Sequence, residues 1–399
     1  MVVKFQEAVN DFMERTHEKL IEFRRTMHQN PELSSEEYNT SEKIFSLLKE
    51  KGLKPEFIEE RGIGVTALIE GKNKGKTIAY RADIDALPIE EKTGLDFKSN
   101  EAGKMHACGH DIHTTTLLGT ALALNEFKDQ LNGNVRVIFQ SGEETFYGAK
   151  KVIESGILNE PKVEKIVMFH TWPDLPAGTI GLKKNEMMAS STSFNFKIMG
   201  KGAHAAHPQK GNDPVVIASN LVSNMQSIIS RRIGAQESAV VTIGKLEAGK
   251  AFNVIPETVY GEGTIRTLDS NLDKFVQERL TDLFEFGTKS FDAKGEVNFS
   301  QATYPVVNDP NVIDIVEKSA EKAIGIENIH WLKQASMGSE DFSLYLQEIP
   351  GALIRLGTNN EDERSKRALH SNDIHFDESA IPTGIKVMTN ALIDLLERN

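Results

Sequence analysis

The chain has 399 residues, of which 39% are hydrophobic and 26% charged, and it carries a net charge of −12. This length exceeds what one hydrophobic core usually serves, so two domains are expected. The acidic balance argues against a nucleic-acid partner, whose phosphates need a basic face, and no segment approaches the ~20 apolar residues of a membrane span. The first ten residues also lack the apolar core of a signal peptide. A cytoplasmic protein is predicted, without nucleic-acid or membrane partners.

The first part of the chain changes from helical periodicity to alternating strands and helices. Residues 1–52 repeat apolar side chains at helical spacing, with a break at P-E-L-S. Short apolar strands then alternate with helical segments, and these strands are expected at residues 65–69, 77–80, 135–139 and 166–169. This alternation predicts an α/β fold with a mostly parallel sheet and flanking helices.

Residues 187–300 follow a different pattern. Strands are expected at 193–198, 239–246, 257–266 and 296–300, with one helix opened by Asp213 and Pro214 and another by Ser270. A βαββαβ order of this size predicts a ferredoxin-like α+β domain. The α/β pattern then returns, with a strand at 352–356 and a terminal helix. The predicted organisation is therefore a catalytic domain formed by residues 1–186 and 301–399, interrupted by an inserted domain at 187–300.

Six residues have the chemistry of a metal site. They lie in short polar or glycine-containing segments or at the ends of apolar runs: Cys108, His110, Glu143, Glu144, His170 and His370. Thiolate, imidazole and carboxylate donors together suit a divalent transition ion. Most of them follow predicted strands, whose carboxyl ends gather ligands in parallel sheets, and so do Asp83 and Asp85. A metal centre at this edge of the sheet is predicted.

The adjacent glutamates are expected to have separate roles, because consecutive side chains point in different directions. One would ligate the metal, and the other would act as a base on a water that the metal acidifies. His106 and His113 are rival ligands. They are ranked below His110, which lies between Gly109 and Asp111 with freedom to turn inward.

Ten motifs, distributed almost from end to end, resemble those of the M20 metallopeptidase family. The resemblance is to its amidohydrolase branch of hippurate hydrolases, indole-acetyl-amino-acid hydrolases and N-acyl-amino-acid deacetylases. The motifs are R-R-T-M-H-Q-N-P-E-L-S from Arg24, R-A-D-I-D-A-L-P from Arg81, M-H-A-C-G-H-D from Met105, S-G-E-E from Ser141, W-P-D-L-P-A-G-T-I from Trp172, G-K-G-A-H-A-A-H-P from Gly200, N-V-I-P-E from Asn253, G-T-I-R-T from Gly263, G-S-E-D-F from Gly338 and L-H-S from Leu369.

The resemblance implies a two-metal site with Glu143 as the general base. The implied ligands are Cys108, His110, Glu144, His170 and His370. Asp83 and Asp85 occupy the place of a ligating His-x-Asp in other branches, and here they are expected to support the ligands from behind. Zn²⁺ or Mn²⁺ is expected, with Ni²⁺ and Co²⁺ as alternatives.

The resemblance also implies that the inserted domain is a lid that forms a homodimer interface. Its His204 aligns with a histidine that reaches the neighbouring subunit's active site and stabilises the oxyanion. Asn253 and Arg266 match residues that hold the substrate's carboxylate. His207 departs from the family pattern, in which an apolar residue is expected.

Arg355 lies inside an apolar strand, where an unpaired charge is costly. It is expected either to pair with Glu340 or Asp341 or to contact substrate, and the sequence does not decide between these.

The predicted function is metal-dependent hydrolysis of an N-acyl-amino acid to a carboxylate and a free amino acid. The nearer alternative is a dipeptidase or carboxypeptidase of the same fold, and the more distant one is a non-catalytic metal-dependent binding protein. The acyl group and the amino acid are not predicted.

Overall fold

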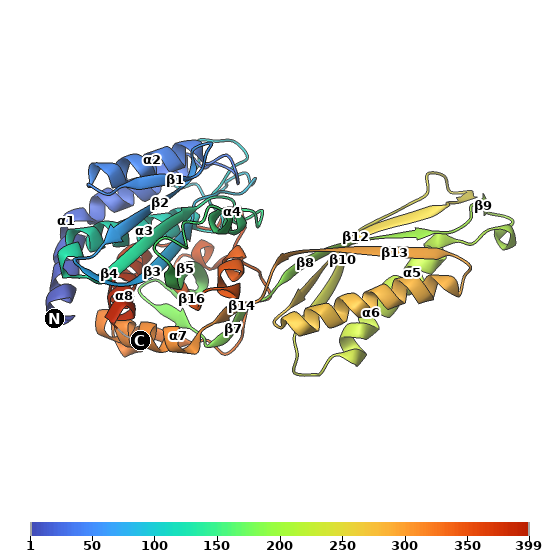
Figure 1. The fold of residues 1–399 in the computed structure, drawn as a ribbon. Helices are drawn as coiled ribbons and strands as arrows, with labels where there is room; N and C mark the ends of the chain where they lie inside the picture. The colour runs from blue at the N-terminus through green and yellow to red at the C-terminus, as the bar shows by residue number, and fades with distance from the viewer. Residues whose placement is uncertain (1, 398–399) are drawn as a thin grey trace. The chain divides into compact units, whose positions relative to one another are not determined.

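The computed structural model describes residues 2–397 and divides them into two compact units (Figure 1). Unit 1 contains residues 2–185, 307–333 and 344–397, and unit 2 contains residues 186–306 and 334–343. Residues 1, 398 and 399, which fall at the ends of the predicted catalytic domain, lie outside the described residues.

Unit 1 is built on a mixed sheet that has eight strands within residues 2–397, in the order β1-β2-β4-β3-β5-β16-β6-β15. The strands are β1 (Pro55–Glu59), β2 (Ile63–Glu70), β3 (Asn73–Asp83), β4 (Asn132–Gln140), β5 (Val163–Pro176), β6 (Ile180–Leu182), β15 (Ile329–Trp331) and β16 (Gly351–Asn359). The central strands β4, β3, β5 and β16 are mutually parallel, while β1, β2 and β6 add antiparallel pairs beside them. The predicted α/β class is confirmed, with more antiparallel pairing than the sequence pattern indicates.

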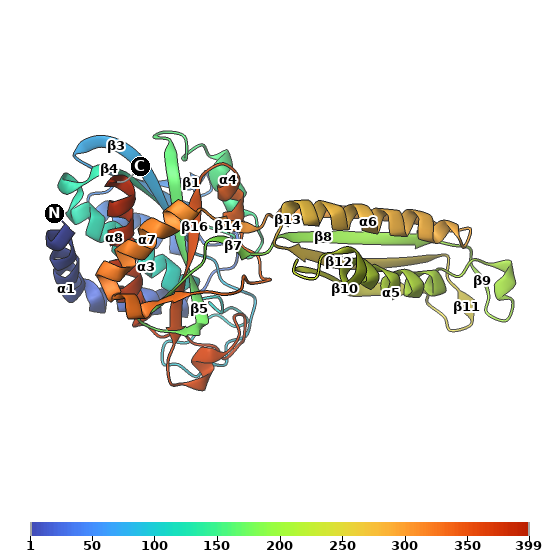
Figure 2. The same ribbon diagram turned by 90° about the horizontal axis from the view of Figure 1, so that it is seen from below.

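Helices of unit 1 cover this sheet, whose central strands are buried on both faces. They are α1 (Val2–Gln29), α2 (Tyr38–Glu50), α3 (His110–Glu126), α4 (Gly148–Glu154), α7 (Pro310–Ile324) and α8 (Ala380–Glu397). Helices α3 and α8 pack on β3 and β4 and on each other, and α1 packs on both helices (Figure 2). Short 3₁₀ turns complete the connections at η1 (Lys128–Gln130), η3 (Ile326–Asn328), η4 (Asp341–Gln347) and η5 (Glu363–Lys366).

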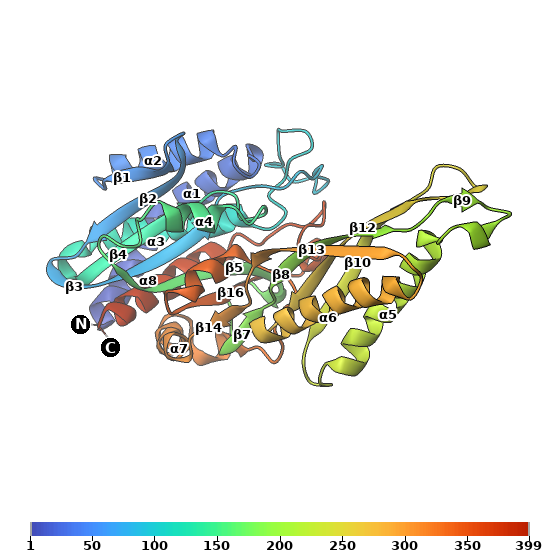
Figure 3. The same ribbon diagram turned by 45° about the vertical axis from the view of Figure 1, so that its right-hand side comes forward.

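Unit 2 follows the predicted βαββαβ order. Its sheet has the order β10-β12-β8-β13, formed by β8 (Ser191–Met199), β10 (Ala239–Ala248), β12 (Thr258–Thr267) and β13 (Lys294–Thr303). Helices α5 (Pro214–Arg232) and α6 (Ser270–Lys289) lie together on one face of this sheet (Figure 3). Asp213 caps α5 as predicted, and Asp269 caps α6, each through its side chain.

Two small ribbons complete the fold. β9 (Ala203–His204) pairs with β11 (Val254–Ile255) in unit 2, close to η2 (Pro208–Lys210), and β7 (Asn185–Met188) pairs with β14 (Val306–Asn308). None of the helices in the described part of the chain is long and apolar enough to span a membrane.

Candidate metal centre and active site

Four segments converge at the carboxyl ends of the parallel strands in unit 1. Asp83 ends β3, Glu143 and Glu144 follow β4, and His170 lies within β5. Cys108 and His110 flank Gly109, whose φ of 86° is left-handed and whose hypothetical Cβ would lie 2.7 Å from Thr171 Oγ1. Only glycine fits this turn, and the turn directs its two neighbours toward the strand ends.

The donor atoms of the predicted ligands lie close together. Glu144 Oε1 is 3.3 Å from His370 Nε2 and 3.9 Å from His110 Nε2. Cys108 Sγ is 3.7 Å from His170 Nε2. His370 reaches the cluster from a distant segment, because its backbone N–H bonds to the carbonyl of Ala107 and its φ is 68°. All six predicted residues of the metal site are therefore in one place.

Hydrogen bonds set which nitrogen of two histidines faces the cluster. His110 Nδ1 lies 2.9 Å from the carbonyl oxygen of Asp85 and 3.1 Å from its Oδ1, so it donates and leaves Nε2 free. His170 Nδ1 donates to the carbonyl of Thr171 at 2.8 Å, which likewise leaves its Nε2 facing Cys108. Such outer contacts orient histidines for metal binding.

The residues fit a pair of divalent ions. His110 Nε2 is buried and makes no hydrogen bond, and Glu144 Oε1 lies 3.9 Å from it. Cys108, Glu144 and His370 offer donor atoms within 4.8 Å of one another, and so do His110, Glu143 and Glu144. These two groups share Glu144, and buried donors without partners are costly unless a ligand satisfies them.

The electrostatics of the cluster agree with this fit. Hydrogen bonds to Cys108 and Glu144 raise the pKa of His370 to about 10. Burial, together with the nearby Glu144, raises the pKa of the Cys108 thiol. His370 and Cys108 therefore hold their protons tightly, and a metal ion that binds these two side chains would displace those protons.

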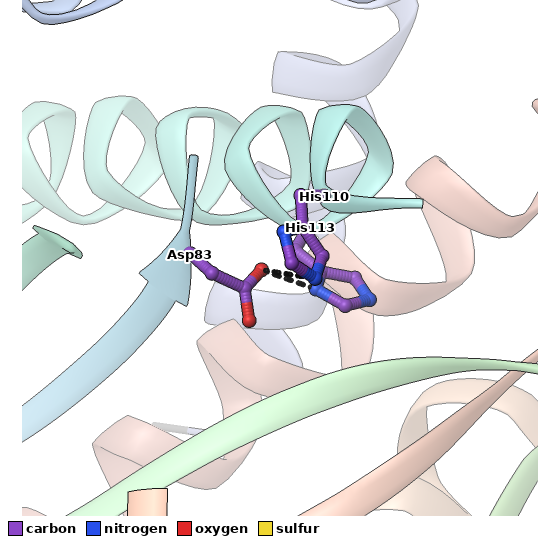
Figure 4. Close-up of side chains that lie close together, drawn as sticks. All are labelled: Asp83, His110 and His113. Atoms are coloured by element: carbon purple, nitrogen blue, oxygen red, sulfur yellow. Dashed lines mark hydrogen bonds and ion pairs between the residues drawn. The ribbon is translucent and has the colours of Figure 1, made fainter. Parts of the chain in front are cut away.

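Asp83 and His113 form a second buried layer behind the cluster. Figure 4 shows Asp83 at the end of β3 facing His110 and His113 on α3. Asp83 Oδ1 lies 2.6 Å from His113 Nδ1, and Asp83 Oδ2 accepts from Arg81 Nη1 at 2.7 Å. His113 Nε2 accepts the N–H of Thr171 at 2.8 Å, so both of its ring nitrogens are occupied. In this arrangement His113 orients its neighbours and has no free nitrogen for a metal.

The candidate site is supported by the N-terminal motif R-R-T-M-H-Q-N-P-E-L-S. The sequence alone did not indicate this role. Ser34 Oγ donates to Asp85 Oδ2 at 2.7 Å, and the same oxygen accepts the N–H of Glu144 at 3.0 Å. Just beyond this segment, Glu37 Oε1 accepts the N–H of Gly142 at 2.8 Å. Asp85 therefore connects Ser34, His110 and the backbone of Glu144.

A buried charge network lies behind the start of α3. Asp111 Oδ2 is 2.8 Å from both Arg24 Nε and His28 Nδ1, and all three side chains are fully buried. His28 Nε2 lies 3.2 Å from Glu91. His106 is also buried, and burial lowers its pKa to about 4, so it is neutral at physiological pH. Arg24 and His28 lie in the motif that begins at Arg24, and Asp111 lies in M-H-A-C-G-H-D, but the sequence alone did not indicate that they form a network.

His204 and Asn253 lie together in unit 2. His204 pairs with Val254 between β9 and β11, and the carbonyl of Asn253 accepts the N–H of Ala205 at 3.1 Å. His204 Nδ1 accepts the N–H of Ala206 at 3.1 Å, so its exposed Nε2 carries the proton and is a donor. The His207 ring is exposed 5.7 Å from the His204 ring.

Arg266 lies elsewhere in unit 2, near the end of β12. Its Nη1 donates to Ser339 Oγ of the G-S-E-D-F motif. Burial lowers its pKa, and no acidic partner of Arg266 occurs within residues 2–397. A half-buried guanidinium without an acidic partner is suited to binding an anionic ligand.

Comparison with known proteins agrees with this geometry. Residues 79–394 match the model of peptidase family M20/M25/M40. The chain is 40% identical to an N-acetyl-L-cysteine deacetylase of Bacillus subtilis over all of this chain and 93% of that protein. It is 37% identical to an N-acetyldiaminopimelate deacetylase of Lactobacillus helveticus over 95% of this chain and 98% of that protein.

A solved structure has the same fold. It is the Bacillus subtilis YXEP protein, described as a dinuclear metal-binding peptidase of the M20 family, with 36% identity and a TM-score of 0.84 over 96% of this chain and 99% of that one. The chain therefore belongs to peptidase family M20/M25/M40, and the resemblance seen in its motifs is confirmed.

Proposed function

We propose that the protein is a dinuclear, metal-dependent amidohydrolase that cleaves N-acyl-amino acids. The observation that carries this is the buried Nε2 of His110, which makes no hydrogen bond and lies in one group of donor atoms with the carboxylates of Glu143 and Glu144. The named deacetylases among its relatives support small N-acyl-amino acids as the substrate class.

Five residues would hold the two ions: Cys108, His110, Glu144, His170 and His370. A thiolate among the donors favours Zn²⁺, and the carboxylate also accommodates Mn²⁺, Ni²⁺ or Co²⁺. When bound, the ions would polarise the substrate carbonyl and acidify a water.

Glu143 performs the proton transfers. Its side chain is almost fully buried, and its carboxylate lies within 4.8 Å of donor atoms of His110 and Glu144. It takes a proton from the attacking water and delivers it to the leaving nitrogen, which becomes the free amine. His204 donates from Nε2 to the oxyanion that develops on the carbonyl oxygen.

The register of unit 2 supports a site shared between subunits. Arg266 neighbours Ile265, which pairs with Thr192 at the start of β8, whereas His204 follows Met199 at its far end. At ~3.3 Å per residue, the intervening length of β12 is roughly 25 Å. A small substrate held by Arg266 cannot also contact His204 of the same unit, so we infer that His204 serves a second subunit.

Unit 2 offers a surface for this homodimer. Within the described residues, β10 pairs only with β12, so its other edge is open. Val240 and Leu246 of β10 are exposed. Pairing of two β10 strands about a two-fold axis would extend the sheet across the dimer and bring these side chains beside the interface.

We place the enzyme in the cytoplasm. Cys108 is a free thiol in the proposed ligand set, and a reducing compartment keeps such a thiol available to metal.

The test is hydrolysis of N-acetyl- and N-benzoyl-amino acids by metal-stripped protein to which Mn²⁺, Zn²⁺, Co²⁺ or Ni²⁺ is restored singly. We expect amino-acid release with at least one ion and none without. Cleavage of dipeptides alone would replace the proposal with a peptidase, and binding of metal without any hydrolysis would leave only a binding protein.

A further inference from the structure

Arg355 is a charged side chain without a partner inside the central sheet. It lies on β16, whose residues are buried up to Thr358, and only 4% of its own surface is exposed. Its Nε and Nη2 are buried and make no hydrogen bond, and no ion pair of Arg355 occurs in the part of the chain that the structure describes. Neither partner suggested by the sequence, Glu340 or Asp341, therefore neutralises it.

The Arg355 guanidinium stays protonated although it is buried. Burial lowers the pKa of Arg355 to about 10, an effect that the exposed carboxylate of Asp174 opposes, so the side chain remains cationic at neutral pH. Its Cζ lies 3.4 Å from the centroid of the Trp172 ring, and this stacking is its main stabilising contact. Nη1 also makes no hydrogen bond, and it is the nitrogen that solvent reaches.

The position of Arg355 is next to the metal centre. Arg355 pairs in register with His170 on the parallel strand β5, so the two side chains leave the same face of the sheet. The His170 and Trp172 rings are 6.3 Å apart, and the guanidinium stacks on Trp172, so it lies within about 10 Å of the His170 ring. His170 in turn is in contact with Cys108 of the cluster.

Other arginines of this protein hold carboxylates through the Nε and Nη2 edge of the guanidinium. Arg25 holds Glu378 through Nε at 3.0 Å and Nη2 at 2.6 Å. Arg364 holds Asp362 through the same two nitrogens at 3.1 Å and 2.6 Å. In Arg355 the same edge is buried within the protein and makes no hydrogen bond, so an incoming carboxylate meets Nη1, the nitrogen that solvent reaches.

We propose that Arg355, stacked on Trp172, binds a second carboxylate of the substrate and makes the enzyme selective for N-acyl-amino acids with two acidic groups. This rests on the proposed function, since it assigns the substrate class of the same site. The second carboxylate belongs either to the amino-acid side chain or to the acyl group.

Matched substrates distinguish these two sources. The metal-loaded enzyme is assayed on N-acetylglutamate against N-acetylglutamine, and on N-succinylalanine against its succinamyl amide, because each pair differs only in one charge. We expect at least a tenfold higher kcat/KM for the acidic member of one pair, and that pair identifies the source.

Arg355→Met tests whether the charge of Arg355 causes the acidic preference, because methionine keeps an apolar contact with Trp172 and removes the charge. We expect loss of the acidic preference mainly through a rise in KM, with neutral substrates changed less than threefold, and partial recovery in Arg355→Lys. The control is Arg136→Met, which removes another buried arginine from the same sheet, one that donates to the carbonyl of Glu160. Absence of acidic preference in the wild type, or its survival in Arg355→Met, overturns the proposal while hydrolysis itself stands.

If no N-acyl-amino acid is hydrolysed, the proposed function is refuted. A binding measurement then still tests whether Arg355 binds a carboxylate. Glutarate is then added to the metal-loaded protein, and thermal unfolding is followed in the wild type and in Arg355→Met. A rise in Tm confined to the wild type and Arg136→Met supports an anion site at Arg355, and equal rises in all three proteins overturn it.

Discussion

Asp85 accepts the backbone N–H of Glu144 with the same oxygen that accepts the hydroxyl of Ser34, while its other oxygen faces His110. One carboxylate thus fixes a predicted ligand side chain and the backbone of another. The N-terminal motif acts on the metal centre through this carboxylate, although none of its residues belongs to the donor cluster.

Replacement of Asp85 by asparagine removes this support without changing its size. An amide can accept on one side only, so we expect the orientation of His110 or of Glu144 to be lost and metal affinity to fall about 10–100-fold. Competition with a chelator measures the affinity. Ser34→Ala, which removes a single bond, is expected to have a smaller effect, and equal affinities in all three proteins would contradict the role given to Asp85.

The two adjacent glutamates should respond differently to the same substitution. Glu143→Gln is expected to retain its metal and lower kcat by about 10³-fold or more, because the proton acceptor is gone. Glu144→Gln is expected to lose metal, since it removes the charged donor between His110 and His370. Metal analysis beside the rate measurement separates these cases, and near-normal turnover of Glu143→Gln would exclude it as the base.

Subunit mixing tests whether His204 serves the partner's site. Glu143→Gln and His204→Ala should each be inactive as homodimers. In a mixed dimer, one site would have an intact Glu143 and receive an intact His204, so random re-association should restore about a quarter of wild-type activity. A mixture that stays inactive, with mixed dimers demonstrated by mass, would show that His204 acts within its own chain.

The buried charges behind α3 should matter more for stability than an exposed ion pair. Asp111→Asn removes the buried carboxylate that Arg24 and His28 share, and we expect it to lower the free energy of unfolding by about 3 kcal/mol. The exposed pair of Arg15 and Glu126 is the control, where Glu126→Gln should cost less than about 1 kcal/mol. Urea unfolding of metal-free proteins measures both losses of free energy. Similar losses for the two substitutions would contradict the larger contribution given to the buried network.

Glu37 makes stability depend on pH. Burial, reinforced by the charge of Asp85, raises the pKa of Glu37 to about 8 from its ordinary value of 4.5. The folded chain therefore binds more protons than the unfolded chain between these values, and the stabilising contribution of protonated Glu37 is lost as pH rises toward 8. Glu37→Gln should gain stability relative to wild type between pH 5 and pH 8, as urea unfolding would measure. The exposed neighbour substitution Glu36→Gln should show no such trend, and a pH-independent difference for Glu37→Gln would contradict the raised pKa.

The sequence predicts the central strands and the proximity of the candidate ligands, because apolar runs mark buried strands and polar residues at their ends face a common edge. It does not predict β1, β6 and β15, which are only three to five residues long. It does not predict the support from Ser34 and Glu37, because their partners Asp85 and Gly142 are distant in the chain and are brought together only by packing. Helix α7 was also missed, although Asp309 and Pro310 carry the same capping signal that identified α5. The separation of His204 from Arg266 follows from the strand register, which composition and periodicity do not determine.

The place of β16 in the sheet has a consequence for biosynthesis. This strand lies between β5 and β6, yet residues 351–359 are synthesised after both of them and after most of unit 2. The newly made chain therefore exposes unpaired edges of β5 and β6 until β16 emerges, while most of unit 2 can already fold. The proposed metal site is completed later still, because it also requires His370.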